Sequence, residues 1–311
     1  MKVCFLFPGQ GAQYPGMGQD LWEKSSRVRE LFNIASETSG VDLKSLLFEG
    51  TEEELRQTDN TQLAVTLVNL ACSAVLAEKG LTPQGCAGFS LGEYSALCEA
   101  GVIRLEDVFP IVKARGFFME KASRKLDGPK GKSGMSAVIG VSWERAEEIV
   151  QALGRTDVFI SNHTSPVQIV LGGTAEGLAM AEDAFDQAGF KKIIPLKVSG
   201  PFHTPLLKEA QQELDDFLKG YTFHDPVKPI YSNVTGEKIT SGAEARRLCI
   251  EQVVSPVRWV KVEENLIKDG FDTFFETGPG SVLRGLMKAF NRELHCLPAG
   301  KLEDIEKITQ G

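Results

Sequence analysis

The residues with the clearest chemical meaning lie in the stretch CAGFSLGEYSAL, where residues 88–92 form a Gly-x-Ser-x-Gly pattern around Ser90. This pattern is typical of a serine held on a sharp turn between a strand and a helix, where its hydroxyl can attack an acyl carbon. Residues 84–88 fit a short strand of small side chains, and residues 91–100 fit the helix. Because the start of a helix favours negative charge, the backbone N–H of Leu91 is a natural donor to an oxyanion.

A serine nucleophile also needs a base, and the chain has four histidines: His163, His203, His224 and His295. His203 lies in KVSGPFHTPLL, directly after a predicted strand and in a loop stiffened by two prolines. His163, in SNHTSP, is expected in a similar loop and is the nearest rival. His295 is the base expected if the chain followed the hydrolase order of serine, acid and histidine. The residues alone favour His203 only slightly.

Arg115 is the second chemical signal. In EDVFPIVKARGFFMEKAS the apolar residues recur at helical spacing, and Arg115 falls on the same face as Val112 and Phe118. A buried guanidinium cannot lose its charge, so it needs an anionic partner. That partner is either a carboxylate of the protein or the carboxylate of a ligand; a third alternative is a side chain that reaches the edge of the helix face.

The loop PGQGAQYPGMGQ follows the first predicted strand, KVCFLF, and its glycines suggest a dinucleotide site. However, Tyr14 stands where the third glycine of that fingerprint belongs, and the acidic residue expected further along is not evident. The loop therefore disfavours a nucleotide fold and leaves another role open.

Composition narrows the functional classes. The chain has 311 residues, of which 42% are hydrophobic, and a net charge of -8. An acidic chain without a polybasic tract indicates neither nucleic-acid nor membrane binding. The six cysteines are scattered without a Cys-x-x-Cys or Cys/His cluster, so neither a metal site nor a disulfide framework is expected. KVCFLF is too short for a signal peptide, and a cytoplasmic globular protein is predicted.

These functional residues require an α/β framework. Apolar runs that fit buried strands alternate with helical patterns, and residues 61–80 read as a helix that is apolar on nearly every face. Residues 133–198 show a βαββαβ order. We expect this segment to be a small ferredoxin-like domain inserted into a larger discontinuous domain, formed by residues 1–132 and 199–311.

Taken together, the motifs resemble a known family. In order and approximate spacing, the chain is similar to the malonyl-CoA:acyl-carrier-protein transacylases over essentially its whole length. The motifs are PGQGAQ, GFSLGEYSAL, the helix with Arg115-Gly116, PFHT, SNVTG, QVVSPVRW and ETGPGSVL. The resemblance implies an α/β-hydrolase-like core with a parallel sheet and a ferredoxin-like insert.

The resemblance also implies a role for each matching residue. Ser90 is the expected nucleophile and His203 its general base. Gln10, in the first glycine-rich loop, is expected to add a second backbone N–H to the oxyanion hole. Gln252 is expected to orient the histidine through its main-chain carbonyl, in place of the acid of a conventional triad. Arg115 is expected to clamp the malonyl carboxylate with its two-pronged guanidinium.

The acyl pocket departs from the family pattern at two positions, Phe89 and Thr164. The residue before the nucleophile is usually histidine, and here it is Phe89. Phe202, before His203, fits the malonyl-selective pattern because a bulky ring leaves little room for a branched acyl group. Asn162 matches a pocket residue of the family, whereas Thr164 stands where a second asparagine is common. Malonyl is therefore favoured over methylmalonyl.

The implied activity is a ping-pong transfer of malonyl from malonyl-CoA to the phosphopantetheine thiol of acyl carrier protein, in fatty acid or polyketide biosynthesis. No metal or redox cofactor is implied. Because carrier proteins are generally acidic, a local basic surface is expected, for which Lys191, Lys192 and Lys288 are candidates. Two alternatives are a serine acyl-hydrolase or thioesterase that uses the same elbow, and a binding module without chemistry.

Overall fold

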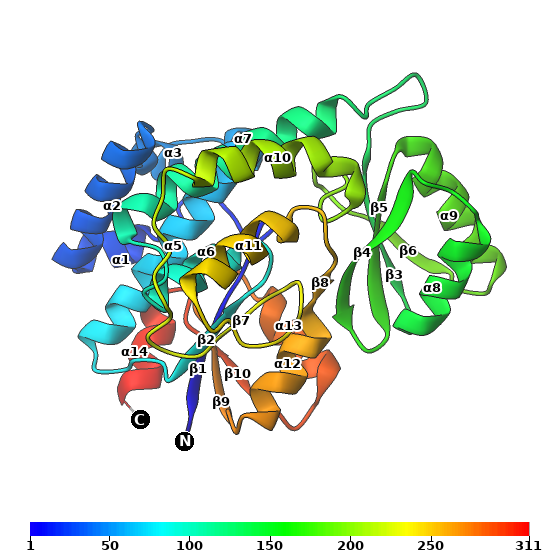
Figure 1. Cartoon of the computed structure of the whole chain (residues 1–311). Coiled ribbons are helices and arrows are strands. Elements are labelled where there is room, and N and C mark those ends of the chain that lie inside the picture. The colour runs from blue at the N-terminus through cyan, green and yellow to red at the C-terminus, as the bar shows by residue number, and fades with distance from the viewer. Residues whose placement is uncertain (311) are drawn as a thin grey trace.

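The computed structural model describes residues 1–310, which form an α/β protein with two five-stranded sheets (Figure 1). The first sheet is parallel throughout, in the order β10-β9-β1-β2-β7. The predicted α/β class with a parallel sheet is thereby confirmed. The strands of this sheet are β1 (Val3–Phe7), β2 (Gly85–Gly88), β7 (Ile230–Tyr231), β9 (Thr273–Glu276) and β10 (Cys296–Pro298).

Helices cover both faces of the first sheet, because its central strands carry apolar side chains on both sides. In β1, Phe5 and Phe7 belong to the core beneath α5 and α6, whereas Cys4 and Leu6 pack in a second core against α12 and α13. The helices of this part are α1 (Gln19–Lys24), α2 (Ser26–Ser39), α3 (Leu43–Phe48), α4 (Glu52–Arg56), α5 (Thr58–Glu78), α6 (Gly92–Glu99), α7 (Leu105–Arg124), α10 (Lys208–Leu218), α11 (Gly242–Gln252), α12 (Trp259–Lys268), α13 (Val282–Phe290) and α14 (Leu302–Gln310).

Helix α5 is the central helix of the larger part, as its apolar sequence predicts. It is long and apolar enough to cross a membrane, yet 83% of its most apolar window is buried inside the protein. The short helix α4 before it begins with the capping box expected at Thr51 and Glu54. The chain thus enters α5 through a defined turn, and α5 packs mainly on α7 and α2.

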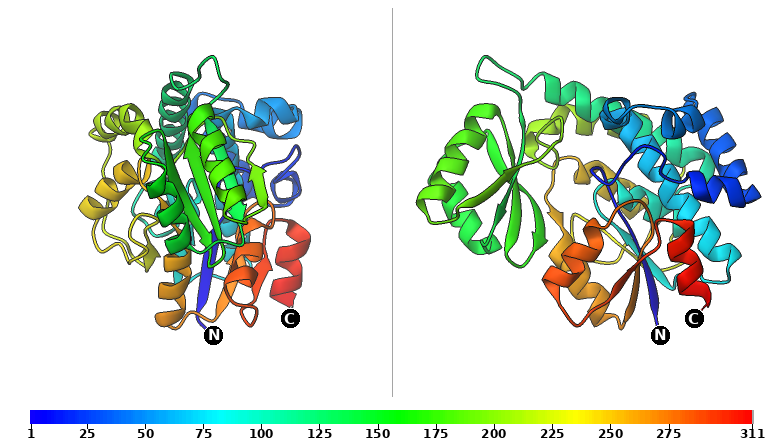
Figure 2. Two further views of the ribbon diagram at one scale, coloured as in Figure 1. Left: turned by 90° about the vertical axis from the view of Figure 1, so that its right-hand side faces the viewer. Right: turned by 180° about the vertical axis from the view of Figure 1, so that it is seen from behind.

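The second sheet lies beside this body in the order β6-β3-β5-β4-β8. Its elements follow the predicted βαββαβ order, and helices α8 and α9 cover its outer face (Figure 2). The inner face turns toward the first part, where Met135, Ala137 and Val170 join the main core. The elements are β3 (Gly134–Ile139), α8 (Trp143–Ala152), β4 (Val158–Ser165), β5 (Gln168–Gly173), α9 (Ala175–Gln187), β6 (Lys192–Pro195) and β8 (Val257–Arg258).

Two features of this sheet differ from the sequence-based expectations. The edge strand β8 comes from far along the chain and pairs in parallel with β4, at Asn162 and His163. In addition, SNHTSP is not a loop, because β4 continues to Ser165. Pairing with both β5 and β8 supplies the backbone partners that keep this polar stretch extended.

Candidate active site

Ser90 lies on the turn between β2 and α6, the strand–turn–helix arrangement that the sequence predicts. Its backbone has a φ of 51°, a left-handed conformation that is rare outside glycine. The turn is tight enough that a Cβ at Gly88 would overlap the backbone of Gly92, and a Cβ at Gly92 would overlap the carbonyl of Phe7. The two glycines therefore allow α6 to start directly beneath the serine.

His203 is the histidine that meets the serine. Its Nε2 lies 2.6 Å from Ser90 Oγ, and its Nδ1 donates a hydrogen bond to the carbonyl oxygen of Gln252 at 2.7 Å. Because a carbonyl only accepts, the proton belongs on Nδ1 and Nε2 is left to accept from the serine hydroxyl. Burial, assisted by the charge of Arg115, lowers the pKa of His203 to about 3, so the ring is neutral and able to take a proton.

The other three histidines lie elsewhere. His163 stacks on Trp143, with ring centroids 5.2 Å apart, and His295 is exposed beside β10. His224 lies in a loop, and its backbone N–H donates a hydrogen bond to the carbonyl of Val102. None of them hydrogen-bonds to Ser90 in the part of the chain that the structure describes.

Arg115 is buried on α7 with only 1% of its surface exposed. Its Nη1 donates to the side-chain oxygen of Gln62 at 2.9 Å, and its Nη2 donates to that of Gln252 at 2.8 Å. Its Nη2 also lies 3.4 Å from Ser90 Oγ, and its Nε has no partner. Burial lowers the pKa of the guanidinium, because no carboxylate among residues 1–310 forms a salt bridge with it. Arg115 therefore neither pairs with a carboxylate of the described residues nor reaches the edge of its helix face.

Gln252 joins the arginine to a buried carboxyl group. Its side-chain oxygen accepts from Arg115, while its Nε2 donates to Glu93 Oε2 at 2.5 Å and to the carbonyl of Ser90 at 3.1 Å. Burial raises the pKa of Glu93 to about 7. Gln252 is thus bonded to base, nucleophile and arginine at once, and its main-chain carbonyl is only one of its contacts.

Two backbone N–H groups beside the serine have no acceptor within the described residues, and they belong to Leu91 and Gln10. The glycine-rich loop that carries Gln10 packs closely on the elbow, since a Cβ at Gly9 would overlap the carbonyl of Phe89. Free N–H groups at a helix start can stabilise an oxyanion. The loop is therefore placed to supply an oxyanion donor beside the serine rather than to bind a nucleotide.

Ser90, His203 and Arg115 open into one cavity of about 250 Å³ between the two sheets, whereas Gln252 and Leu91 do not line it. The sequence-predicted residues that line it are Gln10, Ser90, Arg115, Asn162, Phe202 and His203. Phe89 also lines it, with its ring edge-on to Trp259 at 5.4 Å. The second sheet supplies one wall through Met135 and Val170.

Asn162 reaches this cavity because β4 contains a bulge. Between Ile160 and Asn162 the strand advances two residues while its partner β5 advances one. Such a bulge reverses the alternation of side chains. Ile160 therefore packs in the outer core under the helices, whereas Asn162 and Thr164 face the cavity.

Three polar residues around the serine were assigned no role from the sequence: Gln62, Glu93 and Asn233. Asn233 lies in the SNVTG motif, and its side-chain oxygen accepts from the backbone N–H of Ser90 at 2.6 Å. Gln62 could have been found by the reasoning applied to Arg115, because it is a long polar side chain directly before the apolar run Leu63-Ala64-Val65 of a helix that is buried on nearly every face. Glu93 and Asn233 gave no such signal, since their burial depends on the packing of distant segments.

No group of three or more His, Cys, Asp or Glu side chains within residues 1–310 is arranged to hold a metal ion. The six cysteines are all free, four of them buried. The chemistry available in the cavity is thus that of the serine, the histidine, the arginine and the backbone donors.

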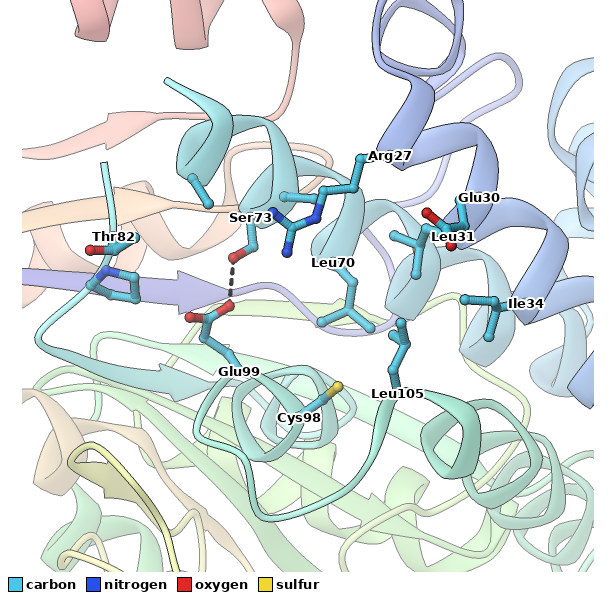
Figure 3. A pocket seen from close by; sticks show the side chains of 13 residues that line it. Arg27, Glu30, Leu31, Ile34, Leu70, Ser73, Thr82, Cys98, Glu99 and Leu105 are labelled. Atoms are coloured by element: carbon cyan, nitrogen blue, oxygen red, sulfur yellow. Dashed lines mark hydrogen bonds between the residues drawn. The ribbon is translucent and has the colours of Figure 1, made fainter. Parts of the chain in front are cut away.

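A second hollow of about 510 Å³ lies at the other end of α6 (Figure 3). Its buried polar groups are engaged, because Ser73 donates to Glu99 at 2.6 Å and Glu99 pairs with Lys228 at 2.7 Å, whereas Arg27 and Glu30 line it from the exposed surface. The thiol of Cys98 also lines this hollow, and burial raises its pKa to about 12. The larger hollow therefore offers space without a reactive group.

Comparisons with known proteins agree with this geometry. The family model described as the acyl transferase domain matches residues 4–304. This chain belongs to the acyltransferase family. The expected family membership is confirmed, and the match covers both sheets.

Individual members of the acyltransferase family resemble the chain over its whole length. The malonyl CoA-acyl carrier protein transacylase of Bacillus subtilis is 40% identical over 311 residues, which cover 99% of this chain and 96% of that protein. The malonyl-CoA:acyl carrier protein transacylase structure from Xanthomonas oryzae has a TM-score of 0.94 at 35% identity, covering 100% and 99% of the two chains. The same TM-score of 0.94, identity of 35% and coverage of 100% and 99% are found for a malonyl-transacylase whose structure is described as a complex with a type II PKS acyl-carrier protein.

Proposed function

We propose that this enzyme transfers a malonyl group from malonyl-CoA to the phosphopantetheine thiol of acyl carrier protein. The observation that carries the proposal is Arg115, a buried guanidinium bonded only to neutral oxygens, with its Nη2 3.4 Å from Ser90 Oγ. A charge in such a place is compensated when an anionic acyl group enters the cavity. The names of the relatives, at 35–40% identity, point to the same donor and acceptor.

The first half of the reaction loads the serine. His203 Nε2 takes the hydroxyl proton of Ser90 while Oγ attacks the thioester carbonyl. The N–H groups of Leu91 and Gln10 hold the oxyanion of the tetrahedral intermediate. When the C–S bond breaks, the proton passes from His203 to the departing sulfur of CoA.

The second half reverses these steps with a new thiol. His203 takes the proton of the phosphopantetheine thiol, the sulfur attacks the malonyl ester, and Ser90 regains its proton as the C–O bond breaks. Gln252 keeps the histidine ring oriented through its carbonyl in both halves. Arg115 pairs with the malonyl carboxylate throughout, which fixes the acyl group beside the serine.

Three side chains of the cavity set the acyl selectivity. Phe202, which is 95% buried, limits the space next to the acyl α-carbon, so an unbranched malonyl group fits better than methylmalonyl. Asn162 offers its amide from the wall formed by β4. Phe89 packs on Trp259 and provides an apolar surface where the family pattern has histidine.

The architecture divides into a catalytic domain and an insert. The catalytic domain, residues 1–132 and 199–311, is α/β-hydrolase-like in that its nucleophile follows a strand of a parallel sheet. The insert, residues 133–198, is ferredoxin-like, which is supported by its antiparallel order β6-β3-β5-β4 and by the two helices on one face. Six free cysteines fit a cytoplasmic enzyme in a reducing compartment.

The carrier protein docks next to α13. On this helix Val282 and Leu286 line the catalytic cavity, while Arg284 and Lys288 line an adjacent hollow with Arg292. None of these three cations forms a salt bridge within the described part of the chain, so they are available to an acidic partner. Of the other candidates, Lys191 already pairs with Asp186, and Lys192 lies on the distant edge strand β6.

Mass spectrometry of the intact protein tests the proposal directly. After brief mixing with malonyl-CoA the wild-type enzyme should gain one malonyl group, and Ser90→Ala should gain none while it remains folded. Added holo carrier protein should then remove the adduct and become malonylated. Free malonate with an unmodified carrier would instead indicate a hydrolase, and the absence of any adduct would indicate a binding module.

A further inference from the structure

Asn233, in the loop after β7, forms two hydrogen bonds to the turn that carries the nucleophile. Its side-chain oxygen accepts from the backbone N–H of Ser90 at 2.6 Å, and its side-chain nitrogen donates to the carbonyl of Gly88 at 2.7 Å. One amide thus bridges two backbone groups that lie two residues apart. Asn233 is fully buried and does not line the catalytic cavity.

The backbone of Asn233 is held on two further sides. Its N–H donates to Glu93 Oε2 at 3.2 Å, and its carbonyl accepts from the N–H of Arg258 at 2.8 Å. Glu93 lies in the first turn of α6, and Arg258 lies in β8, the strand that joins the second sheet. Asn233 therefore connects the elbow to both parts of the molecule and cannot shift independently of them.

The turn needs such a restraint because Ser90 has a left-handed backbone without being glycine. A strained conformation of this kind persists only where the surroundings impose it. The amide bridge also occupies the N–H of Ser90, which leaves the N–H of Leu91 as the free donor at this turn. One side chain thus fixes both the direction of the nucleophile and the choice of oxyanion donor.

We infer that Asn233 is a positioning residue of the acyl transfer, which holds the elbow so that Ser90 Oγ faces His203 and the Leu91 N–H faces the oxyanion. The inference rests on the proposed function only in taking Ser90 as the nucleophile. Asn233 acts through the backbone and touches no substrate. Its loss should therefore lower the rate constant of acylation and leave the affinity for the acyl donor unchanged.

The test compares Asn233→Ala with Asn265→Ala. Asn265 is also buried, and its side chain donates to the carbonyl of Gly236 at 2.9 Å, so it anchors the same loop without touching the elbow. Each variant is mixed with malonyl-CoA and, separately, with a small fluorophosphonate, which labels an activated serine without needing Arg115. A misplacement of a reacting group by about 1 Å can lower the reaction rate about a hundredfold. Asn233→Ala should therefore slow both reactions by about a hundredfold, whereas Asn265→Ala should slow them by less than about threefold.

A third variant separates positioning from space-filling. Asn233→Asp keeps the shape of the side chain, but it loses the donor to Gly88 and places a second oxygen against that carbonyl. Positioning by the amide predicts at least about tenfold slower labelling of this variant, because the bridge keeps its bond from the Ser90 N–H but loses its bond to Gly88 and gains an oxygen facing that carbonyl. This variant also carries the test if Asn233→Ala melts below the assay temperature.

Three results would overturn the inference: equal labelling of Asn233→Ala and wild type, equal slowing by Asn265→Ala, or wild-type rates in Asn233→Asp. A weaker affinity for malonyl-CoA with an unchanged acylation rate constant would overturn it as well. Failure of the proposed function has a different signature. In that case the wild-type enzyme would not be malonylated, while the fluorophosphonate comparison would still measure the effect of Asn233.

Discussion

The catalytic cavity and the larger hollow lie at opposite ends of helix α6, and they differ in how their polar groups are satisfied. In the larger hollow the carboxylate of Glu99 accepts from Ser73 and pairs with Lys228 behind the lining, and the remaining charged residues, Arg27 and Glu30, are exposed to solvent. Beside the catalytic cavity Arg115 Nε and the backbone N–H groups of Gln10 and Leu91 have no partner among residues 1–310, although this cavity has only about half the volume. Buried groups without a hydrogen-bond partner, rather than volume, therefore distinguish the reactive site.

The largest effect is expected where the cavity performs proton transfer. His203→Ala should slow acylation of Ser90 by malonyl-CoA by about a thousandfold, because it removes the only group positioned to accept the hydroxyl proton. His295→Ala should change the rate by less than about twofold, since its ring is exposed and remote. Rapid-mixing mass spectrometry of both variants measures this, and the opposite ranking would support the hydrolase order.

The next effect concerns the partner that Arg115 lacks. Acetyl-CoA should be a poor donor, because its methyl group leaves the buried guanidinium unpaired. Allowing for water in the cavity, we expect discrimination of about 2 to 4 kcal/mol, or about thirtyfold to a thousandfold in kcat/KM. Arg115→Ala should lose malonyl transfer far more than acetyl transfer, and Arg115→Lys should be intermediate at best because it loses the two-pronged geometry.

The measurement is kcat/KM for both donors in the three proteins, with folding checked by thermal melting. If malonyl and acetyl transfer fall in parallel in folded Arg115→Ala, the arginine has a structural role. The contrast between unsatisfied and satisfied groups would then carry no information about substrate choice.

The sequence located the reactive groups better than it located the residues that position them. Ser90 and Arg115 stand out because a local pattern marks each of them, a glycine-flanked turn in one case and a charge on an apolar helix face in the other. A firm choice of His203 over His163 needed the family resemblance, because the two predicted loops are similar and the residues alone favour His203 only slightly. Only pairing with β8 and β5 reveals that His163 belongs to a strand and faces away from the cavity.

The residues that position the reactive groups were not predicted, because their roles depend on contacts between segments that are distant in the sequence. Asn233 bonds to Ser90 across 143 positions of the chain, and Gln252 bonds to Glu93 across 159. The bulge that turns Asn162 toward the cavity is set by its register with β5, which a single strand does not encode. The alternation of strands and helices, by contrast, is local and was predicted correctly for residues 133–198.

A smaller effect is expected on stability, through the buried carboxyl group of Glu93. Burial raises its pKa from the ordinary value of 4.5 to about 7 in the folded protein, so between these pH values the unfolded chain ionises while the folded protein stays protonated. Stability from this residue is therefore lost as the pH rises from 4.5 to 7, by about 3 kcal/mol in total. Glu93→Gln should remove this loss.

Denaturant unfolding of both proteins at pH 4.5, 6 and 8 gives the measurement. The free energy of unfolding of Glu93→Gln relative to wild type should rise with pH and level off above pH 7 to 8. A difference that stays constant over this range would show that Glu93 ionises with its ordinary pKa in the folded protein.

The smallest effect should come from the larger hollow. Ser73→Ala removes one hydrogen bond to Glu99, but Glu99 keeps its ion pair with Lys228 and is partly exposed, so we expect a loss of about 1 kcal/mol in the free energy of unfolding. The acylation rate should remain within about twofold of wild type, because groups satisfied inside the hollow have no part in the chemistry. Helix α6 makes this a demanding test, since its eight residues span only about 12 Å between Glu99 and the turn that carries Ser90. If Ser73→Ala slowed acylation tenfold with little change in stability, movement at one end of α6 would reach the nucleophile at the other, and the larger hollow would belong to the functional site.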